Sequence, residues 1–91
     1  MAALTFTETN GVYTATATVN SDFNVHVEAQ KPCGLSLHIS TVSGAGYQNK
    51  FEEGIGRVFD KDFHAAVFPK YVRIVIGAAP VSGTCYITEA E

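Results

Sequence analysis

"FNVHVEA", residues 23–29, is the stretch of this sequence that decides the fold. Its polar side chains, Asn24, His26 and Glu28, alternate with apolar ones. The apolar positions are Phe23, Val25, Val27 and Ala29. Successive side chains of an extended strand point to opposite faces of a sheet. The alternation therefore predicts a β-strand with one face on a core and the other facing outward.

The same two-residue period continues on both sides of this stretch. It recurs in "LTFTE" at 4–8, "VYTATATV" at 12–19 and "LSLHISTV" at 35–42. Asn-Gly at positions 10 and 11 predicts a tight hairpin, because both residues tolerate positive φ. Alanines at alternate positions of 12–19 leave space, so we expect something bulky to pack across from them.

The middle of the chain is less regular. "FEEGIGRVF", residues 51–59, predicts one irregular strand, in which Gly54 and Gly56 permit a bulge or bend. "DKDFHAAVFP", residues 60–69, predicts a loop or a single helical turn.

The closing stretch, residues 68–91, predicts a compact β-hairpin. "KYVRIVI" at 70–76 and "TCYITE" at 84–89 are the expected strands, with a turn between them. The apolar side chains would form one face, and Tyr71, Arg73 and Tyr86 would stand on the other. An aromatic and cationic grouping of this kind suits a protein interface.

Seven or eight such strands, with turn signals about every 8–12 residues, predict an all-β fold. We expect one domain over residues 1–91, an antiparallel β-sandwich of jelly-roll type. An up-and-down barrel is the nearest alternative.

Composition narrows the class of partner. The chain is 46% hydrophobic and 16% charged, which is typical of a folded domain, and its low charge suggests that another molecule covers part of its surface. The net charge is −3, and residues 1–30 contain no Lys or Arg. A nucleic-acid backbone and anionic lipid are therefore unexpected partners. No apolar run approaches the roughly 20 residues of a membrane span, and the start, "MAALTFTETNG", lacks the pattern of a secretory signal.

Cys33 and Cys85 are the two cysteines. A chain without a signal folds under reducing conditions, so two small hydrophobic thiols are expected, with one disulfide as the alternative. A catalytic thiol is not expected, because no His or basic residue adjoins either cysteine.

His26 and His38 are candidate metal ligands. If Ala29 paired with Leu35 across the intervening loop, the same register would set the two imidazoles opposite each other, and such a pair can bind a transition metal. A third ligand is missing from the pattern, and nothing places His64 nearby. We therefore expect both to be polar residues on a solvated or interfacial face, with no metal site.

Residues 50–62 gather charges of both signs. Carboxylate pairs can serve hydrolysis or bind calcium. However, so short a chain leaves little room for a cleft, Asp60-x-Asp62 lacks the rest of an EF-hand loop, and mixed signs are typical of an interface rim. The sequence also lacks a nucleophile elbow, a P-loop, a dinucleotide fingerprint and a zinc CxxC pair. The expectation is a protein without catalytic residues or a cofactor.

The stretches "LTFTETNGVYTATATV", "DFNVHVEA" and "PKYVRIVIGAAPVSGTCYITE" together resemble the small all-β accessory proteins of tailed-phage particles, such as head decoration proteins. The resemblance implies a β-sandwich that binds the major capsid protein or another virion protein, often as a trimer, and reinforces the particle without catalysis. It also implies a place in the virion, after synthesis in the host cytoplasm. The candidate contact residues are Tyr71, Arg73, Tyr86, His26 and His38.

Two alternatives remain from the residues themselves. One is a carbohydrate-binding module, which would stack a sugar ring on an exposed aromatic side chain. Since Trp is absent, the platforms would be tyrosines, namely Tyr13, Tyr47, Tyr71 and Tyr86. The other is a small bacterial enzyme subunit or regulator.

Overall fold

The computed structural model describes residues 2–42, 44–64 and 70–90. The regular secondary structure of this part of the chain consists of β-strands, joined by turns and loops. Within these ranges no helix is present that could cross a membrane. The strands are β1 (Ala2–Ala3), β2 (Thr7–Thr9), β3 (Val12–Val19), β4 (Phe23–Glu28), β5 (Cys33–Ser40), β6 (Gln48–Ile55), β7 (Val58–Phe63), β8 (Lys70–Ile76) and β9 (Tyr86–Glu89).

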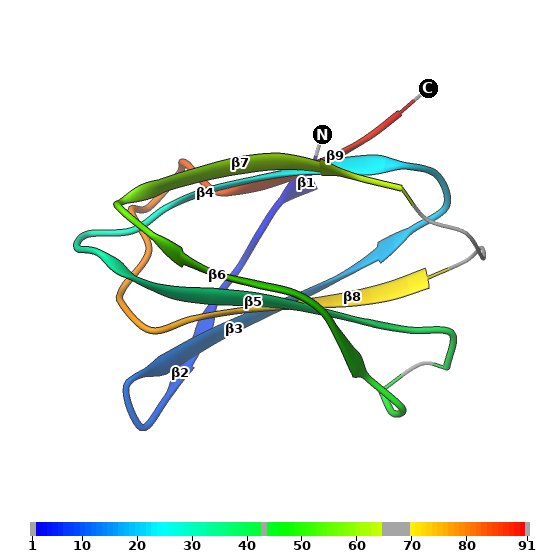
Figure 1. The fold of residues 1–91 in the computed structure, drawn as a ribbon, viewed down its shortest axis with the longest axis horizontal. Coiled ribbons are helices and arrows are strands. Elements are labelled where there is room, and N and C mark those ends of the chain that lie inside the picture. The colour runs from blue at the N-terminus through cyan, green and yellow to red at the C-terminus, as the bar shows by residue number, and fades with distance from the viewer. Residues whose placement is uncertain (1, 43, 65–69, 91) are drawn as a thin grey trace.

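Two antiparallel sheets pack face to face (Figure 1). The four-stranded sheet has the order β1-β9-β4-β7, and the five-stranded sheet has the order β2-β3-β8-β5-β6. The predicted all-β sandwich is therefore confirmed. The alternative of an up-and-down barrel is wrong, because strands next to each other in sequence repeatedly fall in different sheets.

The strand pairs are nested along the chain. β5 pairs with β6 at the centre, and β4–β7, β3–β8 and β1–β9 enclose that hairpin in turn. One long antiparallel ribbon is thus folded across two sheets, which is the jelly-roll arrangement. Strand β2 adds a short hairpin to β3, and its turn has positive φ at Asn10 (53°) and Gly11 (80°), as the Asn-Gly pair predicted.

The inward faces of strands β3 to β9 make the core. The predicted alternation holds in β4, where Val25 and Val27 are fully buried, and in β8, where Ile74 and Ile76 are fully buried. Thr16 and Thr18 of β3 are exposed, whereas Ala15 and Val19 are buried. Burial of this apolar surface is the main stabilising term for a domain of this size.

Aromatic side chains fill the sandwich between β6 and β7. Phe63 lies with its ring centroid 5.5 Å from Phe23 and 5.5 Å from Phe51, and 6.5 Å from Phe59. The Lys61 ammonium lies 5.2 Å from the centroid of the half-buried Phe51 ring, so a cation covers the outer side of this cluster.

The prediction of one irregular strand at 51–59 is wrong. β6 ends at Ile55, the chain turns at Gly56 and Arg57, and β7 begins at Val58 in the other sheet. The amide of Ala29 donates to the Arg57 carbonyl at 2.7 Å, which holds this crossing. β7 also replaces the first part of the loop or helical turn predicted at 60–69, and residues 65–69 lie outside the described residues.

The first predicted strand, 4–8, is also divided. β1 pairs with β9, and residues 4–6 cross to the other sheet before β2. Leu4 and Phe6 are partly buried against the core, so the apolar alternation marks a crossing rather than one continuous strand.

The predicted closing hairpin is wrong as well. β8 belongs to the five-stranded sheet and β9 to the four-stranded sheet, so residues 77–85 connect the two layers. Ile74 and Ile87 both line the core, but they belong to opposite walls of it. Cys85 in this connection is buried and Cys33 is half-buried, and both are free thiols.

Candidate functional site: the outer face of the five-stranded sheet

The register that would set His26 opposite His38 is not formed. His26 in β4 stands opposite Asp60 of β7 and Tyr86 of β9, while His38 in β5 stands opposite Arg73 of β8. The loop from β4 to β5 crosses between the sheets, so it cannot set a common register for the two strands. The two imidazoles therefore lie on opposite outer faces of the sandwich.

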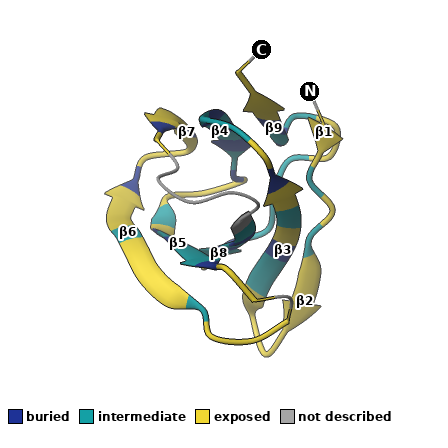
Figure 2. Cartoon of the chain, turned by 90° about the vertical axis from the view of Figure 1, so that its right-hand side faces the viewer, coloured by how far each residue is buried: buried dark blue, intermediate teal, exposed yellow. Residues whose placement is uncertain are grey.

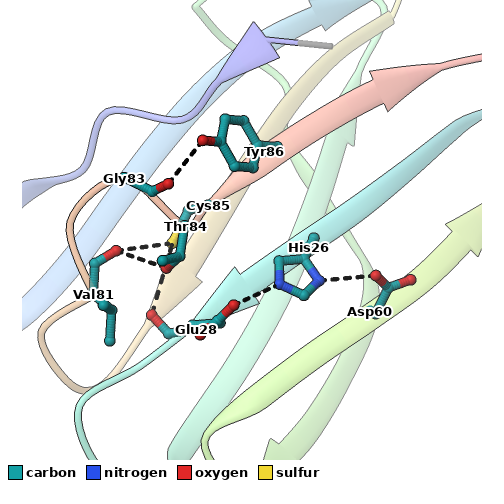
Figure 3. Close-up of polar contacts among 8 residues, drawn as sticks. All are labelled: His26, Glu28, Asp60, Val81, Gly83, Thr84, Cys85 and Tyr86. Carbon is teal, nitrogen blue, oxygen red and sulfur yellow. Dashed lines mark hydrogen bonds and ion pairs between the residues drawn. The ribbon is translucent and has the colours of Figure 1, made fainter.

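The predicted contact residues divide between these two faces. His38, Tyr71 and Arg73 belong to the five-stranded sheet, and His26 and Tyr86 belong to the four-stranded sheet. The expected grouping of Tyr86 with Tyr71 and Arg73 is thus not formed. Instead, the Tyr86 hydroxyl donates to the Gly83 carbonyl at 2.7 Å (Figure 3).

The four-stranded sheet pairs its charges with one another. His26 Nδ1 lies 2.8 Å from an Asp60 oxygen, and His26 Nε2 lies 2.9 Å from a Glu28 oxygen (Figure 3). A carboxylate can only accept, so both contacts are satisfied when the ring carries two protons. The hydrogen bonds to Glu28 and Asp60 raise the pKa of His26 above 6.5. The pKa of Asp60 is lowered by hydrogen bonds from Asn24 and His26.

These charges do not form a metal centre. In the described ranges, no group of three or more His, Cys, Asp or Glu side chains is arranged to hold a metal ion. The carboxylates of residues 50–62 are also separated, because Glu52 and Glu53 lie on β6 and Asp60 and Asp62 lie on β7 in the other sheet.

His26 is expected to stabilise the fold most strongly between about pH 4 and 6.5. The pKa of His26 is higher in the folded chain than its value of 6.5 in the unfolded chain, so its protonation stabilises the fold. This contribution is complete below pH 6.5 and is lost as the pH rises through the pKa of the folded chain. Asp60, with a lowered pKa, contributes above 3.8 and loses its contribution as the pH falls through the folded pKa. His26→Gln should cost about 0.5–1 kcal/mol in this window, the scale of a partly exposed pair, and less above it. Thermal melts across pH 3–9 measure the difference.

His38→Gln is the matched control. Burial and then the nearby Arg73 lower the pKa of His38, so its neutral form is the one that favours the fold. The wild-type chain should therefore lose stability relative to His38→Gln as the pH falls below 6.5, in the opposite direction to His26→Gln. The same pH dependence for both variants would contradict the two environments described above.

The outer face of the five-stranded sheet is mostly uncharged. Hydroxyl side chains border its central strand on both sides: Thr16 of β3 stands opposite Arg73, and Ser36 of β5 stands opposite Val75. We call this surface the hydroxyl face; it comprises Thr14, Thr16, Thr18, Ser36, His38, Glu52, Tyr71, Arg73 and Val75, together with Tyr47 beside them.

Arg73 is the centre of the hydroxyl face. The Tyr47 ring covers its guanidinium, with 4.6 Å from Cζ to the ring centroid. Its Nε is shielded from solvent and has no hydrogen-bond partner among the described residues. His38 stands opposite it on β5, and His38 Nε2 lies 3.1 Å from the Ser36 hydroxyl. A cation here is thus held by an aromatic ring and has no anionic partner within that part of the chain.

A shallow depression lies on the same face beside Val75, two residues along β8 from Arg73. Gly34 of β5 pairs with Gly54 of β6, and the amide of Gly77, which directly follows β8, donates to the Gly34 carbonyl at 3.1 Å, so the three glycines lie side by side. The depression has a volume of about 500 Å³ and is also lined by Val12 and Glu52, among others. A glycine inside a strand weakens it, and often marks a place where another group approaches closely.

Sequence reasoning found Arg73, Tyr71 and His38 but missed the part played by Tyr47 and the glycine row. The sequence presents Tyr47 only as a candidate sugar platform, because nothing in its loop predicts that it lies beside β8. Gly34 and Gly54 were visible as glycines next to strand patterns, but their alignment depends on the pairing of β5, β6 and β8.

Comparisons with known proteins find no matching family model, no similar curated protein and no similar solved structure.

Proposed function

We propose that this chain is a non-enzymatic structural protein of a tailed-phage particle, a decoration or auxiliary subunit that binds the major capsid protein or another virion protein. It docks through the hydroxyl face and stabilises the particle. The observation that carries the proposal is Arg73, a cation under Tyr47 at the centre of a mostly uncharged sheet face, which forms no ion pair with any described residue. Arg and Tyr are the residue types that most often anchor the core of a protein interface.

The fold supports this proposal without deciding it. Jelly rolls recur in viral structural proteins and in sugar-binding domains, and a fold alone does not specify a function. The four-stranded sheet is the less suitable docking face, because Glu28 and Asp60 already bind His26 and would have to be separated or desolvated.

Association with the particle tests the proposal directly. Virions made by cells that carry the gene should contain the chain in fixed stoichiometry after density-gradient purification. The chain should form a homo-oligomer, with a trimer favoured. Sedimentation at micromolar concentration tests this for the isolated chain, and crosslinking on the purified virion tests it for the bound chain. Absence of the chain from purified virions would contradict the proposal.

Carbohydrate binding is the second candidate, because the depression beside Val75 is large enough for a sugar ring and offers the Ser36 hydroxyl and the Glu52 carboxylate as hydrogen-bond groups. Tyr71 and Tyr86 cannot both stack on the same sugar ring, since they lie on different sheets. Saturable glycan binding that is lost in Glu52→Gln, with no association with virions, would favour this candidate.

Gly54→Val is expected to abolish docking while leaving the fold intact. A Cβ at Gly54 would meet nothing within 4 Å, and the residue has no positive φ, so valine fits the strand. Valine also has a higher strand propensity than glycine, so the free energy of unfolding should stay equal or rise by up to about 1 kcal/mol. Particle occupancy should fall at least about tenfold, because the valine side chain would project from the floor of the depression into the contact.

Gly56→Val is the matched control for that measurement. Gly56 lies in the turn between β6 and β7, away from the depression, and a Cβ there also meets nothing within 4 Å. It should leave occupancy unchanged. Full occupancy in Gly54→Val would show that the depression is outside the contact.

A further inference from the structure

We propose that Arg73 is a carboxylate-binding site, and that its occupant is the side chain of a glutamate or aspartate on the partner protein. The identity of the partner rests on the function proposed above, whereas the carboxylate site rests on the geometry around Arg73 alone.

The first step is the distribution of charge. Each of the ion pairs found among the described residues contains a histidine, and Arg73 belongs to none of them. Its side chain is half-buried on the central strand of the hydroxyl face. The neighbours across the register are Thr16 and His38, and burial together with Arg73 itself keeps the pKa of His38 below its usual value. The groups directly across the register from the cation are therefore neutral, and the Glu52 carboxylate of the same face lies one strand further away, on β6 opposite Ser36.

The second step is the unsatisfied donor. The Arg73 Nε–H is removed from water and has no acceptor in the described part of the chain. A buried donor without a partner costs free energy, which an incoming acceptor would recover. The guanidinium edge presents parallel N–H groups, and a carboxylate can accept two of them at once. Tyr47, which lies just before β6, covers the face of the guanidinium, so a carboxylate would have to approach its edge.

The third step is the kind of molecule that carries the carboxylate. A single ion pair at a partly exposed arginine binds a free anion weakly, because water competes with it. Useful affinity requires further contacts around the pair. The hydroxyl face supplies these over Thr14, Ser36 and the glycine-floored depression, a spread of contacts that matches a protein surface rather than one small anion.

The test uses the side-chain N–H signals of arginine in a nitrogen-15-labelled chain. The protein contains two arginines, Arg57 and Arg73, so Arg57 serves as an internal control. The probes are a capped Gly-Glu-Gly peptide, its Gly-Gln-Gly counterpart, glucuronic acid and sodium sulfate. Because a short peptide makes few of the further contacts, we expect weak binding: the Arg73 signal should shift progressively at high concentrations of the glutamate peptide, at least several-fold more than with the glutamine peptide, and Arg57 should not shift.

Other patterns would overturn the inference. A larger response to glucuronic acid than to the glutamate peptide would assign the site to an acidic sugar. Equal responses to sulfate and to the peptide would indicate an adventitious ion only. No shift of Arg73 with any probe would remove the site.

Particle binding separates this inference from the proposed function. Arg73→Gln should lower virion occupancy by about thirtyfold or more, as expected when one member of a desolvated charge pair is removed, and Arg57→Gln should leave it unchanged. Normal occupancy of Arg73→Gln would refute the carboxylate contact and leave the docking function standing. A glutamate-dependent shift of Arg73 in a chain that no virion contains would refute the function and leave the site standing.

Discussion

Replacing Ile74 with aspartate is expected to unfold the chain. Ile74 is fully buried in β8 and stands between Ala15 of β3 and Leu37 of β5, so the new carboxylate would have no solvent and no partner charge. Burial of an unpaired charge costs several kcal/mol, and a domain of this size has a stability of about 5 kcal/mol or little more. Circular dichroism and the dispersion of amide NMR signals should both report an unfolded chain at 25 °C.

The neighbouring residue provides the control for this prediction. Val75 follows Ile74 in the same strand, but it points to the outer face and is only half-buried. Val75→Asp should therefore fold, with a loss of about 1 kcal/mol. Val27→Asp in β4 should unfold the chain as Ile74→Asp does, because Val27 is fully buried in the other sheet. Equal stability of Ile74→Asp and Val75→Asp would contradict the assignment of faces.

Replacing Phe63 with alanine is expected to have the second largest effect on stability. Phe63 is 8% exposed and its ring contacts those of Phe23 and Phe51. Removing a buried aromatic ring costs about 3–5 kcal/mol, through lost transfer free energy and the cavity that remains. The loss of stability should be large because Phe63 is in contact with each of the other rings of this cluster, Phe23, Phe51 and Phe59. Urea denaturation measures it as a lower midpoint.

Val58→Ala is the control in the same strand. Val58 is 59% exposed at the start of β7, so its truncation should change stability by less than about 0.5 kcal/mol. A similar loss in both variants would show that β7 contributes to stability through its backbone pairing rather than through the aromatic cluster.

The alternation of side chains was sufficient to predict the strands but not their partners. Residues 23–29 predicted β4 and its buried face correctly, because a two-residue period directly describes an extended strand against a core. The same pattern could not show that β8 and β9 belong to different sheets. A local hairpin and a crossing between layers both need a polar, glycine-containing connection, and residues 77–85 satisfy either requirement.

β7 was missed for a related reason. In "FDKDF" at 59–63 the alternation is present, but its inward position between the phenylalanines is occupied by Lys61, which reads as a polar loop. The structure explains the lysine by its place at a sheet edge, where its ammonium lies over Phe51. Figure 2 shows the exposed outer strand β6 at the same side of the sandwich.

The candidate site was only partly predictable. The outward positions of Arg73 and Tyr71 follow from the alternation of β8, because Val72 and Ile74 point to the buried face of the same strand. The cover that Tyr47 gives to Arg73 and the row of Gly34, Gly54 and Gly77 are tertiary features. They depend on nested pairings between residues far apart in the chain, and a single sequence contains no direct signal for such pairings.

We propose that the chain docks through the hydroxyl face and not through the opposite sheet. Thiol labelling tests it in two variants, Thr16→Cys on the hydroxyl face and Thr88→Cys on the four-stranded sheet, each in a Cys33→Ser background that removes the half-buried native thiol. Both positions are exposed in the free chain, so a maleimide should label both. On the virion, we expect Thr16→Cys to become at least tenfold less reactive, while Thr88→Cys reacts as before. Protection of Thr88→Cys with Thr16→Cys still reactive would contradict it.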